Sequence, residues 1–214
     1  MDTRRNFSIA MVWINGGSNL DAKGKKGLNQ ILCSLLNRGC KGFENFEFSD
    51  YIDSYGAELN LETVEDGMLL SLKSLNEHFY KLLPLLDLTI NKPLLLSSQF
   101  QKVKKNTINS LKKEKENPFN IAFEKWRKLV YLNHPYAYNS SGYEEDILRI
   151  THNDVISEYE KLKKRNKYLI SNNSKIKKSS LNSFNPVTYK DNSSSKLLEF
   201  KNCNRFVSTY QKSN

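Results

Sequence analysis

Residues 57–75 hold the pattern that most restricts the fold of this chain. Over residues 57–63, small or apolar side chains alternate with polar ones, and after a turn at residues 65–67 the run MLLSLKSL alternates again. Alternation with a period of two sends successive side chains to opposite faces of a strand. Two such runs joined by a short polar turn indicate a β-hairpin. We therefore expect an antiparallel sheet with one buried face.

The segments around this hairpin show mainly the helical spacing of apolar residues, with further strands expected at 7–14 and 168–170. Helices are expected from 27 to the break at Gly39, at 45–55, at 77–90 with an interruption at Pro84, at 99–116, at 119–131, from 144 and from 151 to 162. This order predicts an α+β fold in which an antiparallel sheet has helices packed on one face.

The helix expected at 119–131 has apolar residues at helical spacing, and we expect them to face the core. They are Ile121, Phe123, Trp126, Leu129 and Val130.

The basic residues are concentrated at the C-terminal end. The formal net charge is +10, and residues 161–214 hold 13 Lys and Arg against 2 Asp and Glu, whereas residues 1–160 hold 20 against 21. We therefore expect an α+β domain at 1–170 and a basic tail at 171–214, rich in Asn, Ser and Lys, that is disordered or a remnant of a second domain. Nucleic-acid binding through this tail is an alternative function, but its basic cluster at 163–167 lacks interleaved aromatic residues, so nucleic acid is not the expected partner.

Nothing in the sequence predicts export or a membrane span. No stretch approaches eighteen apolar residues, and the N-terminal MDTRRNF lacks the apolar run of a secretion signal. Cys33, Cys40 and Cys203 are too few and too unevenly spaced for a disulfide framework. We expect a cytoplasmic protein with no membrane partner.

Five segments, in the correct order, resemble the N-terminal half of an M16 peptidase, the family of insulinase, pitrilysin and the mitochondrial processing peptidase. They are WINGGSNLD (13–21), GLNQILCSLLNRGC (27–40), YGAELNLETVEDGMLLSL (55–72), KKEKENPFNIA (112–122) and HPYAYNSSGYEEDILRITHNDVISEYEKL (134–162). The similarity covers nearly all of residues 8–170 and implies an M16 metallopeptidase-like domain. Family domains usually begin with a further strand, before the one at residue 7 here, and continue into a second similar domain; we find neither in this sequence.

Members that cut peptides carry an inverted zinc motif, H-x-x-E-H, on one helix and a third ligand, Glu, on a later helix. The resemblance places the two His at Gln30 and Ser34, the catalytic Glu at Cys33, and the third ligand at Ser110, 76 residues after Ser34. Neutral amides and hydroxyls are poor zinc ligands, and a thiol is not a carboxylate base. The resemblance therefore implies a member without catalytic residues, metal or cofactor, similar to bacterial and especially cyanobacterial non-catalytic subunits.

In two-chain M16 peptidases one chain carries zinc and its partner has a degenerate site. The resemblance implies that this chain forms a heterodimer with an active M16 subunit, closes its chamber around peptide substrates, and leaves zinc to that subunit. An enzyme with an atypical metal set, or with Cys33 as a nucleophile, is an alternative at this stage. Against it, His78, His134 and His152 do not have the spacing of metal ligands.

Overall fold

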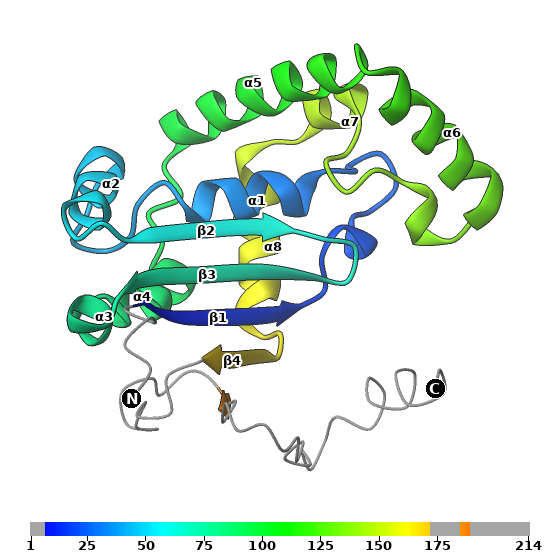
Figure 1. Ribbon diagram of the computed structural model, residues 1–214. Coiled ribbons are helices and arrows are strands. Elements are labelled where there is room, and N and C mark those ends of the chain that lie inside the picture. The colour runs from blue at the N-terminus through cyan, green and yellow to red at the C-terminus, as the bar shows by residue number, and fades with distance from the viewer. Residues whose placement is uncertain (1–6, 172–184, 189–214) are drawn as a thin grey trace, which may run out of the picture.

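The computed structural model describes residues 7–171 and 185–188, which form one five-stranded sheet and the helices around it (Figure 1). The strand order is β2-β3-β1-β4-β5. The strands are β1 (Phe7–Asn15), β2 (Glu58–Thr63), β3 (Gly67–Leu75), β4 (Lys167–Ser171) and β5 (Asn185–Thr188). The first three neighbouring pairs are antiparallel and β4–β5 is parallel. The α+β prediction is confirmed, with a parallel edge pair that the sequence pattern did not indicate.

The predicted hairpin is formed by β2 and β3, with Glu58 opposite Lys73 and Thr63 opposite Met68. The loop that follows β1 lies against the hairpin turn. A Cβ atom on Gly17 would lie 1.9 Å from the carbonyl oxygen of Val64, so only glycine fits there. This close approach fixes where the chain leaves the sheet toward the first long helix.

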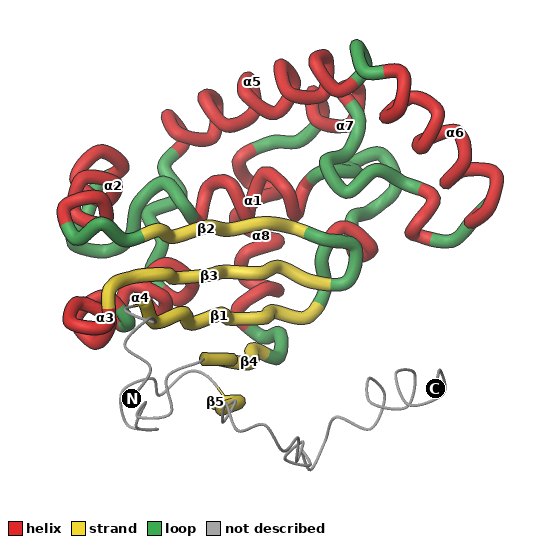
Figure 2. The backbone as a smooth tube through the Cα atoms, viewed as in Figure 1, coloured by secondary structure: helices red, strands yellow, loops and turns green. Residues whose placement is uncertain are grey.

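The helices cover one face of the sheet, as predicted. In Figures 1 and 2 the strands lie in front, and α1 (Leu28–Leu36) and α8 (His152–Lys163) lie behind them. Along β1 the side chains of Ala10, Val12 and Ile14 are buried beneath these helices, and the alternate residues are partly exposed. The sheet therefore has a single buried face.

The remaining helices follow the predicted order. They are α2 (Asn45–Ser54), α3 (Asn76–Leu82), α4 (Pro84–Asn91), α5 (Ser97–Glu114), α6 (Pro118–Tyr131) and α7 (Glu144–Arg149), with 3-10 turns at η1 (Ser18–Leu20) and η2 (Pro135–Ala137). The helix expected at 77–90 is two helices, because Pro84 begins α4 at its first turn, where its missing N–H leaves no hydrogen bond unmade.

The predicted orientation of the helix at 119–131 is wrong. The five residues expected in the core are all exposed on α6: Ile121 40%, Phe123 45%, Trp126 49%, Leu129 76% and Val130 52%. No residue of α6 is buried. A helical period identifies an apolar stripe, but it does not say which surface the stripe meets.

The expected tail at 171–214 falls largely outside the described residues, and so does the nucleic-acid alternative that depends on it. Ser171 and β5 are the parts of it that the structure places, and they lie at the edge of the sheet. Among the described residues, no helix has both the length and the apolar character needed to cross a bilayer.

Candidate functional site

A hollow of about 320 Å³ lies between α1 and α5, and three of the four positions that the resemblance assigns to the zinc site line it. Gln30, Ser34 and Ser110 line it together. The other lining residues are Arg38, Val103, Asn106, Thr107, Leu111, Glu114 and Ser141. Convergence of these positions from two helices agrees with the assignment made from the resemblance; the assignment itself stays a prediction.

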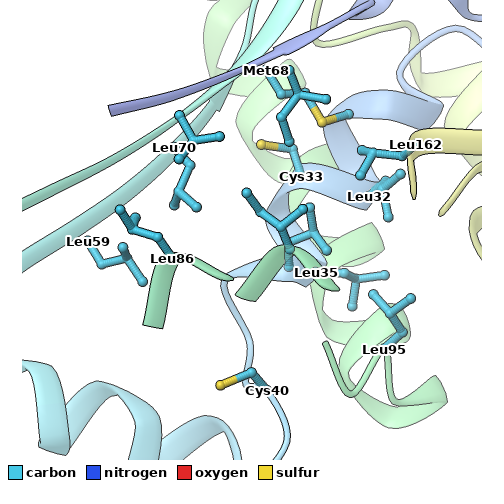
Figure 3. Packing of buried hydrophobic residues seen from close by; sticks show 14 of the residues in the cluster. Leu32, Cys33, Leu35, Cys40, Leu59, Met68, Leu70, Leu86, Leu95 and Leu162 are labelled. Carbon is cyan, nitrogen blue, oxygen red and sulfur yellow. The ribbon is translucent and has the colours of Figure 1, made fainter. Parts of the chain in front are cut away.

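Cys33 does not line this hollow. Its side chain is 1% exposed and points into the core, in the cluster with Met68 and Leu70 in Figure 3. Burial raises the pKa of the Cys33 thiol to about 12, with the nearby charge of Glu62 acting in the same direction and a hydrogen bond with Thr63 opposing it. A thiol that stays protonated at neutral pH is a poor nucleophile, which weighs against the alternative of a cysteine-dependent enzyme.

The donor set of the hollow does not fit zinc. The Gln30 amide nitrogen lies 3.5 Å from the Ser34 hydroxyl, and neither group ionises near neutral pH. Within the described residues, no group of three or more His, Cys, Asp or Glu side chains is placed to hold a metal ion.

The three histidines lie in separate parts of the fold. His78 is beside Glu77, His134 accepts a hydrogen bond from the Tyr136 backbone N–H, and a ring nitrogen of His152 lies 2.7 Å from the Leu95 carbonyl oxygen. They do not converge, so no replacement metal site is made from them.

Asp21 holds the N-terminal end of α1 in place. Its buried carboxylate accepts hydrogen bonds from the Gly27 N–H at 2.7 Å, the Asn29 N–H at 2.9 Å and the Asn29 side-chain amide at 2.7 Å. Burial raises the pKa of Asp21, and these hydrogen bonds and Lys26 partly oppose the shift. The negative charge also suits the positive end of the helix dipole.

The sequence patterns missed two charged residues of the hollow, Arg38 and Glu114. Glu114 is the last residue of α5 and lines the hollow. The signal was present in the spacing: Gln30, Ser34 and Arg38 are four residues apart, and Ser110 and Glu114 continue the facing side of α5.

Fold and site together define an M16-type peptidase domain, and the family comparison agrees. The sequence model of the insulinase family, peptidase family M16, matches residues 1–142, and the chain belongs to this family. One similar relative is the protein named "Non-peptidase homolog YmxG" of Helicobacter pylori (strain ATCC 700392 / 26695), which is 24% identical over 156 residues, 72% of this chain and 36% of that protein.

Solved structures show the same fold. The inactive M16 peptidase domain from Pseudomonas fluorescens superposes with a TM-score of 0.66 at 22% identity, over 73% of this chain and 38% of that one. A protease from Helicobacter pylori superposes with a TM-score of 0.76 at 18% identity, over 84% of this chain and 44% of that one. The chain thus spans less than half the length of these relatives.

In this domain, the positions that the resemblance assigns to the catalytic motif lack the chemistry of that motif. The named relative is a non-peptidase protein, and residues without zinc-binding or general-base chemistry occupy the positions that the resemblance assigns to the motif.

Proposed function

We propose that this chain is the non-catalytic partner of a zinc-bearing M16 subunit and helps that subunit to enclose peptide substrates. The observation that carries the pairing is the exposed apolar side of α6, which we call the α6 stripe: Phe119, Ala122, Phe123, Trp126, Leu129 and Val130. Each of these residues lies three or four positions from at least one other member, so they share one face of the helix.

The opposite, polar side of α6 is attached to the domain. The Arg127 guanidinium donates to the Tyr136 carbonyl oxygen at 2.9 Å and forms an ion pair with Glu65 at 2.7 Å. The Asn120 side chain donates to the Glu114 carbonyl oxygen at 3.3 Å. Because these contacts hold the polar side inward, the α6 stripe faces away from the domain.

The size of the α6 stripe fits one half of a protein interface. Its larger members are 45% to 76% exposed, and neighbouring rings stack, with the centroids of Phe119 and Phe123 6.0 Å apart and those of Phe123 and Trp126 5.4 Å apart. With roughly 200 Å² for a fully exposed large side chain, five of them present roughly 600 Å². That is at the upper end for a patch on a monomer and close to the ~800 Å² that each partner buries in a standard interface.

Charge favours a different chain over a second copy as the occupant. Lys125 is exposed beside the stripe and has no ion-pair partner among the described side chains. In a symmetric antiparallel pair of α6 helices, the two Lys125 side chains would face each other and repel. A partner helix with an apolar stripe and an acidic flank would pair with Lys125.

The open edge of the sheet supports the peptide-binding part of the proposal. β2 ends the strand order and pairs only with β3 in the described sheet. An extended peptide can add to such an edge through backbone hydrogen bonds. Zinc would then belong to the partner, and the free, buried thiols of Cys33 and Cys40 suit a cytoplasmic location for the complex.

Co-expression with an H-x-x-E-H-bearing M16 chain from the same organism tests this function. We expect a 1:1 complex by light scattering and chelator-sensitive cleavage of a quenched peptide that needs both chains. Leu129→Glu should abolish the complex, whereas the matched control Leu148→Glu, at a residue 58% exposed on α7, should leave it intact. Failure of the wild-type chains to associate would refute the pairing, and an intact Leu129→Glu complex would exclude the α6 stripe as its interface.

A further inference from the structure

The hollow between α1 and α5 has one charge of each sign, and the two lie toward opposite ends. Arg38 follows the C-terminal end of α1, and because α1 and α5 run in opposite directions (Figure 1), this is the end of the hollow toward the N-terminal half of α5. Glu114 ends α5, at the end of the hollow that Ser141 also lines. Among the residues that line the hollow, these are the two charged side chains.

Both charges are available to a ligand. The Arg38 side chain has no hydrogen-bond or ion-pair partner among the described residues, and its backbone N–H alone is used, to the Leu35 carbonyl oxygen. Glu114 accepts one long hydrogen bond, 3.4 Å from the Asn139 amide, and forms no ion pair with a described residue. Arg38 and Glu114 are therefore not neutralised by each other.

The wall between the charges is neutral and polar. Gln30, Ser34, Asn106 and Ser110 present amides and hydroxyls, each of which can donate to or accept from a peptide group. Val103 and Leu111, which are also on α5, add apolar surface to this wall. Such a lining matches a chain of peptide groups with small side chains better than it matches an inorganic ion.

The dimensions select a short peptide. Six residues separate Gln30 from Leu36 at the end of α1, which at 1.5 Å per residue is roughly 9 Å, and Arg38 lies two residues further along the chain. An extended peptide spans about 3.3–3.6 Å per residue, so three or four residues cover this length. The hollow of about 320 Å³ is at the lower end of the range for small-ligand sites.

We propose that this hollow binds a short zwitterionic peptide of three or four residues, with its carboxylate at Arg38 and its ammonium group at Glu114. The guanidinium can hold a carboxylate through two parallel hydrogen bonds. This goes beyond the proposed pairing, because the binding needs only this chain, and it assigns a ligand to the place where the resemblance puts zinc in active members.

Calorimetric titration of the full chain with Ala-Ala-Ala tests the proposal. The free tripeptide should bind, and amidation of its C-terminus or acetylation of its N-terminus should each weaken binding about tenfold, since each removes one charge-assisted contact. Arg38→Gln should weaken binding of the free tripeptide about tenfold and leave binding of the amidated one unchanged. Glu114→Gln should do the same with respect to N-acetylation. Arg149→Gln, an exposed arginine outside the hollow, is the matched control and should bind like the wild type.

Three results would overturn the proposal. The first is no heat of binding with millimolar tripeptide for a chain whose circular dichroism and melting temperature are normal. The second is equal affinity for free and blocked peptides, and the third is an Arg38→Gln variant that loses free and amidated peptides alike. None of these results depends on whether an M16 partner chain exists, so the proposed pairing is tested separately.

Discussion

Replacing Arg165 should strongly destabilise this domain, because its guanidinium joins three elements. It donates to the Gly16 carbonyl oxygen at 2.8 Å, just after β1, and to the Asn29 side-chain oxygen on α1 at 3.1 Å. It also forms an ion pair with Glu158 on α8, in which the two side chains are only 11% and 5% exposed. Arg165→Met keeps much of the side-chain volume and removes all three contacts.

The magnitude follows from what is left behind. Removing one member of a buried ion pair leaves an uncompensated charge and costs about 3–5 kcal/mol. Lys161 remains 3.1 Å from Glu158, but its side chain is 68% exposed, so it offsets only a small part. We therefore expect Arg165→Met to lower the free energy of unfolding by about 3–4 kcal/mol.

Urea unfolding followed by circular dichroism measures this change. The double variant Arg165→Met with Glu158→Leu should be more stable than Arg165→Met by about 2 kcal/mol, since it contains no stranded carboxylate. A single variant that loses less than about 1 kcal/mol, or a double variant no more stable than the single one, would contradict the buried-charge account.

The remaining predictions concern the site and its support. A variant combining Gln30→His, Ser34→His and Ser110→Glu should bind one zinc ion per chain by metal analysis and melt at a higher temperature with zinc, an increase that a chelator removes. Because the pKa of Asp21 is raised above its ordinary 3.8 in the folded state, ionised Asp21 opposes folding. Urea unfolding gives the free energy of unfolding of the wild type and of Asp21→Asn at each pH. The difference, wild type minus variant, should therefore fall as the pH rises from 3.8 to the raised pKa and stay level above it. Cys33, with a thiol pKa of about 12, should resist alkylation in the native chain at pH 8 and react in denaturant, as mass spectrometry can show.

Each of these has a clear contrary result. Failure of the triple variant to bind zinc while folded would mean that the three side chains do not converge. If the stability difference rises with pH over this range, folding lowers the pKa of Asp21 and does not raise it. Rapid alkylation of Cys33 in the native chain would show that its thiol is accessible.

The sequence predicted local structure well where the spacing of apolar residues fits only one kind of element. The period of two over residues 57–75 identified the β2–β3 hairpin, because strict alternation is typical of a half-buried strand and does not fit a helix. The stripe on α6 was assigned to the wrong side, because helical spacing contains no information about whether a neighbour covers it. The parallel pairing of β5 with β4 also lacked a signal, since the strand is four residues long in a polar segment.

Prediction of the candidate site residues depended more on the family resemblance than on the helical spacing of residues. Helical spacing alone treats positions 30, 33 and 34 as near neighbours on α1, yet Gln30 and Ser34 line the hollow while Cys33 faces the sheet. The contact of α1 with Ser110 on α5 joins residues far apart in the chain, and the 76-residue spacing known from the family was needed to foresee it. Arg38 and Glu114 each lie four residues after one of these positions, but only the placement of both helices shows that they line one hollow.

The two sides of α1 have separable roles, and this bears on how an M16 domain loses its reaction without losing its fold. Leu28, Ile31, Leu32, Leu35 and Leu36 are at most 6% exposed and seat the helix in the core, whereas Gln30 and Ser34 take no part in the hydrophobic cluster. Substitutions on the hollow side therefore remove few core contacts. The resemblance places the metal ligands of active members on this side, so exchanging such ligands for other polar groups would leave the core contacts that seat α1 unchanged.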